Sequence, residues 1–117
     1  MRVEAMTPML RSWDIARAIA FYETLGFASV MQGDGFAALA RDGFEIMLSA
    51  PNAHEGDVAP AFTGSLYLRV DDVEAAWAAY GALGRLCYPI ETFDYGMREF
   101  AIYDLDGYLI QFGQPVG

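Results

Sequence analysis

Two segments of the chain place apolar residues at helical spacing. In residues 14–26 and again in residues 72–84, apolar side chains recur every three or four positions (Ile15, Ala18, Ile19, Tyr22 and Leu25; Val73, Ala76, Trp77, Tyr80 and Leu83). An aspartate precedes each run as an N-cap, and a glycine that can adopt the left-handed conformation follows it (Asp14 and Gly26; Asp72 and Gly84). The pattern predicts two amphipathic helices, each with one face to bury.

Alternating and apolar runs around these helices predict β-strands. Residues 65–70 alternate between an aliphatic and a polar set, so a strand there has two different faces (Leu66, Leu68 and Val70; Ser65, Tyr67 and Arg69). Three strands are predicted after each helix, at 27–32, 35–41 and 43–49 and at 86–91, 97–104 and 108–113. Turns with glycine at 41–43 and 104–107 join the last two strands of each group as antiparallel hairpins.

The two groups of elements are copies of one module. Residues 10–27 return 58 positions later as residues 68–85, and residues 36–49 return 64 positions later as residues 100–113. The second pairing matches Phe36 with Phe100, among other identities. We therefore predict a single domain, residues 1–117, of two repeated modules, 1–50 and 62–117, joined by a linker at 51–61.

Charge excludes several function classes. The chain has no lysine, seven arginines and sixteen acidic residues, giving a formal net charge of −9. Lysine Schiff-base chemistry and a P-loop are therefore excluded, and nucleic acid is not an expected partner, because a phosphate-binding groove needs clustered basic residues. An acidic surface attracts cationic ligands, although the same charge also serves solubility alone. Cys87 is the only cysteine, so no internal disulfide forms.

Nothing in the sequence points to a membrane. The apolar runs are far shorter than the ~20 residues that span a bilayer, and the first ten residues lack a basic flank followed by an apolar stretch. We expect a cytoplasmic protein with no membrane partner.

Three runs of sequence resemble one known family. They are DIARAIAFYETLGF at 14–27, LRVDDV at 68–73 and DLDGYLIQ at 104–111. These resemble the vicinal-oxygen-chelate superfamily, which includes glyoxalase I, extradiol dioxygenases and bleomycin-resistance proteins. The resemblance implies an α+β fold in which two βαβββ modules form curved mixed sheets around a cup, with the helices outside. It also implies a homodimer, often with the cup shared between modules of different chains.

Enzymes of this superfamily hold a metal through one residue of each module's first strand and one of each last strand. Carried onto this chain, the resemblance places these positions at Thr7, Met47, Ser65 and Gln111, and the two internal offsets relate them in pairs. Hydroxyl, thioether and carboxamide groups lack the basicity that a divalent transition metal requires. Glu45 shares the strand face of Met47, but a lone carboxylate does not hold the ion. We therefore expect no metal, no cofactor and no catalytic residues, so that an enzyme is disfavoured.

The same strand faces supply candidate ligand-binding residues. Strand alternation puts soft apolar and charged side chains beside the four positions (Met9, Arg11, Glu45, Tyr67 and Arg69), a mixture typical of small-molecule sites. Mutual neutralisation of Arg11, Arg69 and Glu45 explains these charges equally well. Phe93 and Tyr95 precede the seventh strand, either as an aromatic rim over the ligand or as an ordinary loop packed on a hydrophobic edge.

Within the superfamily, the chain is most similar to bleomycin-resistance proteins. The similarity lies in TPMLRSWD at 7–14, AFYETLGF at 20–27 and YGMREF at 95–100. It implies a metal-free, dimeric protein that sequesters a small organic molecule, including a cationic one, with bleomycin-type antibiotics as the named candidate. Two alternatives stay open. One is a metal-dependent lyase, isomerase or dioxygenase that recruits its ion through Glu45, Gln111 and substrate oxygens; the other is a regulatory or scaffold module with a filled cup.

Overall fold

The first half of the chain forms a four-stranded mixed sheet with one helix. Its elements are β1 (Met9–Arg11), α1 (Ile15–Thr24), β2 (Ala28–Gly33), β3 (Phe36–Arg41) and β4 (Phe44–Ser49). The strand order is β1-β4-β3-β2, with β1 parallel to β4 and the other pairs antiparallel. The computed structural model describes residues 1–51, 61–62 and 64–117. Most of the predicted linker, residues 52–60, lies outside the described residues.

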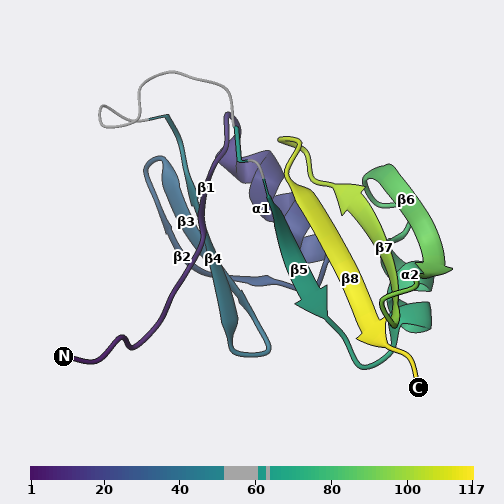
Figure 1. Ribbon diagram of the computed structural model, residues 1–117. Helices are drawn as coiled ribbons and strands as arrows, with labels where there is room; N and C mark the ends of the chain where they lie inside the picture. The colour runs from purple at the N-terminus through teal and green to yellow at the C-terminus, as the bar shows by residue number, and fades with distance from the viewer. Residues whose placement is uncertain (52–60, 63) are drawn as a thin grey trace. The chain divides into compact units, whose positions relative to one another are not determined.

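The second half repeats this arrangement. It contains β5 (Ser65–Arg69), α2 (Val73–Tyr80), β6 (Arg85–Thr92), β7 (Met97–Tyr103) and β8 (Leu109–Pro115), in the sheet order β5-β8-β7-β6 (Figure 1). The two halves form separate compact units, Met1–Pro60 and Ala61–Gly117. Each unit therefore shows the predicted βαβββ order, and the α+β fold class is confirmed. The predicted strand bounds agree with the observed ones within two residues.

In each unit the helix packs on one face of its own sheet. Helix α1 buries Ala18, Ile19 and Tyr22, and the sheet beside it buries Leu39 and Leu48. In the second unit Trp77 and Tyr80 of α2 lie against Phe100 and Phe112, with ring centroids 5.1 and 5.5 Å apart. These contacts leave the opposite face of each sheet free of the helix.

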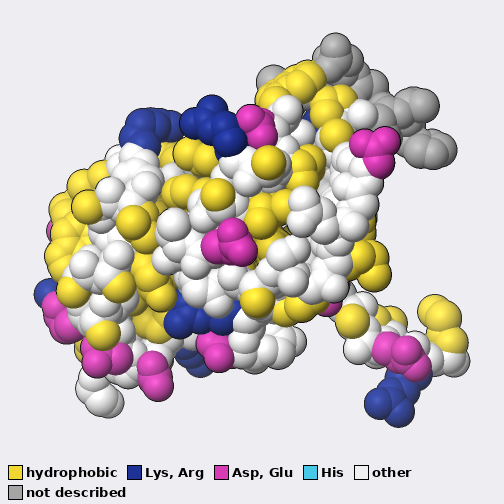
Figure 2. Space-filling view, turned by 180° about the vertical axis from the view of Figure 1, so that it is seen from behind, with side chains coloured by type: hydrophobic (Ala, Val, Ile, Leu, Met, Phe, Trp, Pro, Cys, Tyr) yellow, Lys and Arg dark blue, Asp and Glu magenta, His cyan; other side chains and the backbone are white. Residues whose placement is uncertain are grey.

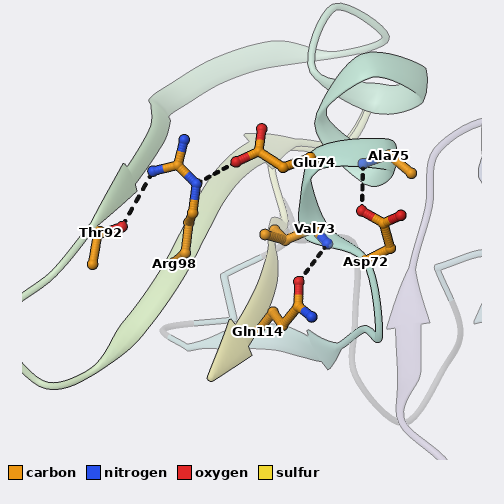
Figure 3. Close-up of polar contacts among 7 residues, drawn as sticks. All are labelled: Asp72, Val73, Glu74, Ala75, Thr92, Arg98 and Gln114. Carbon is orange, nitrogen blue, oxygen red and sulfur yellow. Dashed lines mark hydrogen bonds and ion pairs between the residues drawn. The ribbon is translucent and has the colours of Figure 1, made fainter. Parts of the chain in front are cut away.

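The helix N-termini form as the aspartate pattern predicts. The Asp14 carboxylate accepts the Arg17 backbone N–H at 3.1 Å, and the Asp72 carboxylate accepts that of Ala75 at 3.0 Å. Figure 3 shows a further anchor of α2, where Gln114 of β8 accepts the Val73 backbone N–H at 2.9 Å. Helix α2 is thus fixed to its sheet by side chains as well as by apolar packing.

An ion pair closes the same end of α2. Arg98 of β7 contacts the Glu74 carboxylate through its Nε and donates to the Thr92 hydroxyl at 3.2 Å (Figure 3). This arginine points to the helix side of the sheet. It is therefore engaged away from the opposite face, where the candidate site residues lie.

The two helices end differently, although the repeat predicts matching ends. Gly26 follows α1 with φ of +86°, as expected. Helix α2 ends earlier, at Tyr80, and Gly81 has φ of −57°. The Trp77 ring packs so close to Gly81 that a Cβ there would lie 2.5 Å from it. Leu83 consequently leaves the helix face and is 41% exposed, so the prediction that it packs like Leu25 was wrong.

None of the described helices has the length and apolar character needed to cross a bilayer. Figure 2 shows one face of the molecule, on which acidic groups lie at several separate places, some of them beside arginines. The negative charge on that face is therefore dispersed.

Candidate functional site

The candidate residues of the second unit share the sheet face opposite α2. Tyr67 of β5 lies beside Gln111 of β8, and Arg69 lies beside Gly113. Gly113 in turn lies beside Glu99 of β7. Directly paired residues of neighbouring strands point to the same side of a sheet, so the face opposite α2 carries all of them.

A buried glutamate is the centre of this face. Glu99 is 2% exposed and accepts hydrogen bonds from three tyrosines. The Tyr67 hydroxyl donates to Oε2 at 2.5 Å, the Tyr88 hydroxyl donates to Oε1 at 3.0 Å, and the Tyr95 hydroxyl also donates to Oε1. We call Glu99 and these three tyrosines the phenol cluster. It draws on β5, β6, β7 and the turn between β6 and β7.

The phenol cluster continues into Ser65 and Gln111, two of the four positions that the family resemblance assigns to a metal site. Gln111 donates from Nε2 to the Tyr88 hydroxyl at 2.9 Å and accepts the Ser65 hydroxyl at 2.5 Å through Oε1. Because Tyr88 accepts this bond, its own proton is free to be donated to Glu99. Ser65 and Gln111 are thus part of one neutral hydrogen-bond chain that ends at the carboxylate.

Gly113 makes the phenol cluster possible. A Cβ built on this residue would lie 2.0 Å from the Tyr67 hydroxyl oxygen and 2.7 Å from the adjacent ring carbon. No side chain fits there while Tyr67 reaches Glu99. Glycine is therefore needed at this position because it leaves room for the Tyr67 side chain. Its backbone conformation does not require glycine, since its φ lies outside the left-handed region.

The predicted aromatic turn adds to the cluster. The Phe93 and Tyr95 rings stack at 5.5 Å with 7° between their planes, and Tyr88 meets Phe93 edge-on at 5.4 Å. Phe93 is half-buried, whereas Tyr95 is 65% exposed. Tyr95 is therefore exposed to solvent on one side, while its ring stacks on Phe93 and its hydroxyl donates a hydrogen bond to Glu99.

Burial and hydrogen bonding to Glu99 make the three phenols weaker acids. Burial and the hydrogen bond to Glu99 raise the pKa of Tyr67 well above its ordinary value. Burial also raises the pKa of Tyr88 and outweighs the lowering by Gln111. The hydrogen bond to Glu99, together with loss of water, raises the pKa of Tyr95 to about 12. The phenols consequently stay protonated at neutral pH.

Alkaline titration should reveal these tyrosines. We expect the phenolate absorbance of the folded chain to include a group that ionises near pH 12, and this group should ionise at lower pH in Glu99→Gln. The contribution of Tyr95 to stability is complete below pH about 10 and is lost as the pH rises through about 12, since the unfolded chain ionises first. Identical titration curves for the two proteins would contradict the cluster.

The candidate residues of the first unit lie on the corresponding face of their own sheet. Met9 of β1 lies beside Met47 of β4, and Glu45 lies beside Ala40 of β3. Arg11 lies beside Ser49 on that same face, opposite α1. Thr7 precedes β1, which begins at Met9. Met9, Arg11, Glu45 and Met47 therefore share one face of the first unit's sheet.

The four superfamily metal positions do not fit a metal ion. Thr7, Met47, Ser65 and Gln111 offer no imidazole, thiolate or carboxylate, and Ser65 and Gln111 are already bonded to one another. No group of three or more metal-binding side chains occurs within the part of the chain that the structure describes. His54 falls outside the described residues.

Sequence reasoning missed Glu99, Tyr88 and Gly113. A glutamate inside the apolar strand at 97–104 was the available signal, because it shares its face with Met97 and Ala101. Tyr88 was hidden by register irregularities in β6 on both sides of it. The sequence gives no indication of the role of Gly113, because that role depends on the position of the Tyr67 hydroxyl in the folded chain.

A family model decides the identity. The model of the Glyoxalase/Bleomycin resistance protein/Dioxygenase superfamily matches residues 6–112. The chain belongs to this superfamily. The predicted family is therefore confirmed.

Several solved structures resemble the chain over nearly its whole length. A bleomycin resistance determinant encoded on the transposon Tn5 is 28% identical, covers 97% of this chain and 98% of its own, and has a TM-score of 0.76. A bleomycin-binding protein complexed with bleomycin is also 28% identical, with coverages of 96% and 98% and a TM-score of 0.72. TioX from Micromonospora sp. ML1 shares the fold at 20% identity, coverages of 97% and 100% and a TM-score of 0.79. No curated protein matches the chain.

Proposed function

We propose that this member of the superfamily is a metal-free binding protein of the bleomycin-resistance type that sequesters a small organic molecule. The observation that carries the proposal is the chemistry of the former metal positions in the second unit. Ser65 and Gln111 form a neutral hydrogen-bonded pair that leads through Tyr88 to Glu99. Such a set suits recognition of an organic ligand better than activation of an ion.

The surrounding side chains support an aromatic, positively charged ligand. Tyr95 offers a stacking surface above Phe93, and Tyr67 is 43% exposed on the same sheet face. The formal net charge of −9 favours the approach of cations. Two structurally similar proteins are a bleomycin resistance determinant and a bleomycin-binding protein, and bleomycin is therefore our candidate for this chain.

The remaining parts of the proposal concern assembly and setting. We propose that both units, 1–50 and 62–117, act as one ligand-binding domain and that the active species is a cytoplasmic homodimer. Protection would then be stoichiometric, so that affinity and protein level determine resistance. Chemical cross-linking and size-exclusion chromatography of the full chain test the dimer.

Fluorescence titration tests the proposed function. Trp13 is 52% exposed and Trp77 contacts the core of the second unit, so both are intrinsic reporters. We expect metal-free bleomycin to change the emission saturably, at a fixed stoichiometry and in the presence of a chelator. Absence of binding at concentrations that saturate a known bleomycin-binding protein would contradict the proposal.

Two substitutions locate the ligand. We expect Glu45→Gln and Tyr67→Phe each to weaken bleomycin binding several-fold, since the first removes a charge and the second a hydrogen bond to Glu99. Both variants should keep the far-ultraviolet spectrum of the parent. The matched controls are Glu23→Gln, an exposed position on α1, and Tyr80→Phe, on the helix side of the second sheet. Unchanged titrations for both test variants would remove these residues from the site.

A further inference from the structure

Glu99 is a buried carboxylate whose partners are all neutral. Within residues 64–117, its hydrogen bonds come from Tyr67, Tyr88 and Tyr95. The arginine next to it in sequence, Arg98, contacts Glu74 on the opposite side of the sheet. Among the residues that the structure describes, the ion pairs of Arg41 and Arg98 are with Asp42 and Glu74, and no ion pair joins Glu99 to an arginine. Buried carboxylates are ordinarily paired with a cation, so a positively charged ligand group would be a favourable partner for Glu99.

The phenols transmit the charge of Glu99 to the surface. A hydroxyl that donates to a carboxylate becomes a stronger acceptor, because successive hydrogen bonds polarise one another. Each phenol has a single proton, and in Tyr67 and Tyr95 that proton is committed to Glu99. Their oxygens can therefore accept further hydrogen bonds from a ligand but cannot donate any. The phenol cluster therefore favours ligand groups that donate hydrogen bonds.

We infer that the phenol cluster binds a cationic nitrogen group bearing N–H bonds, such as a primary ammonium or an amidinium, carried by the ligand. This inference rests on the proposed function and names the chemical class that one part of the ligand must have. The N–H bonds would be accepted by the phenol oxygens, and the positive charge would balance Glu99. A neutral alcohol lacks the charge, and a quaternary ammonium lacks the N–H bonds.

Two features of the cluster support an organic cation over a metal ion. It has one carboxylate and three protonated phenols, whereas a divalent ion needs several anionic or strongly basic ligands. Tyr67 and Tyr95 are also 43% and 65% exposed, so ring faces lie at the edge of the cluster. Aromatic faces attract organic cations. The charge of Glu99, the phenol oxygens and the tyrosine rings would therefore all attract the same cationic group of the ligand.

Three probes that share a benzyl group test the inference: benzylammonium, benzyl alcohol and benzyltrimethylammonium. Binding to the full chain is measured by calorimetry or by chemical-shift changes at neutral pH. We expect benzylammonium to bind at least about tenfold more tightly than either other probe, and Glu99→Gln to abolish this preference, since charge-assisted hydrogen bonds are the strong ones. Glu23→Gln is the matched control and should keep the preference.

The outcomes separate this inference from the proposed function. If metal-free bleomycin binds but the three probes bind equally, or if Glu99→Gln keeps the preference for benzylammonium, the cation site is wrong and the binding function stands. If neither bleomycin nor any probe binds, both are wrong. Should Glu99→Gln fail to fold, Tyr95→Phe decides the matter. It alters an exposed turn residue, and an unchanged preference in that variant overturns the inference.

Discussion

Replacing Phe112 by alanine is expected to lower the free energy of unfolding by about 3–5 kcal/mol, the range found for buried phenylalanines. Phe112 is 1% exposed on the helix side of β8. Its ring stacks on Phe100 at 4.9 Å and meets Tyr80 of α2 at 5.5 Å. Truncation would leave a cavity between α2 and its sheet that rigid neighbouring rings fill poorly. Chemical denaturation of the full chain measures the change.

Phe44→Ala is the matched control. The same side chain is removed, but Phe44 is 76% exposed at the start of β4. We expect a change of at most about 0.5 kcal/mol, as for other surface substitutions. Equal losses at Phe44 and Phe112 would mean that the helix-side core has been assigned to the wrong residues.

Gly113→Ala should disrupt the phenol cluster by displacing Tyr67. The added methyl carbon would lie 2.0 Å from the Tyr67 hydroxyl oxygen, so Tyr67 must move away from Glu99. Losing a hydrogen bond to a buried charged group costs about 1.5–3 kcal/mol. We expect destabilisation of that size in denaturant unfolding, together with ionisation of Tyr67 at lower pH.

A second glycine and a double variant make the Gly113 test specific. Gly33 also lies in a strand, but a Cβ there meets nothing within 4 Å, so Gly33→Ala should not destabilise the chain. In a Tyr67→Ala background, Gly113→Ala should cost little more than Tyr67→Ala alone, because the clashing ring is absent. Additive losses would show that Gly113 acts through some contact other than Tyr67.

The local pattern of the sequence predicts most of the fold. Helical spacing, aspartate caps and the turns at Gly43 and Gly107 depend on neighbours in the chain, and all of them appear in the structure. The end of α2 did not follow the repeat, because the helix ends at Tyr80, before the matching glycine Gly84. The spacing of apolar positions continues through Leu83 and gives no sign of this earlier end.

The candidate site was predicted in part. Alternation placed Ser65 and Tyr67 on one face, the family resemblance added Gln111, and the structure joins the three in one hydrogen-bond network. Glu99 was not predicted, because a glutamate within an apolar strand gives no sign of which side chains will cover it. Its three donors come from β5, β6 and the turn before β7. The network therefore depends on sheet register, which short-range patterns determine only weakly.

Metal content is the most direct test of our proposal that this superfamily member binds its ligand without a metal ion. The full chain, purified without chelators and equilibrated with excess Zn²⁺, Mn²⁺ or Fe²⁺, is passed through a desalting column and measured by elemental analysis. We predict far less than one metal ion per chain, because the donors at Thr7, Met47, Ser65 and Gln111 are neutral. One tightly retained ion per chain, lost when Gln111 or Glu45 is replaced, would contradict the account.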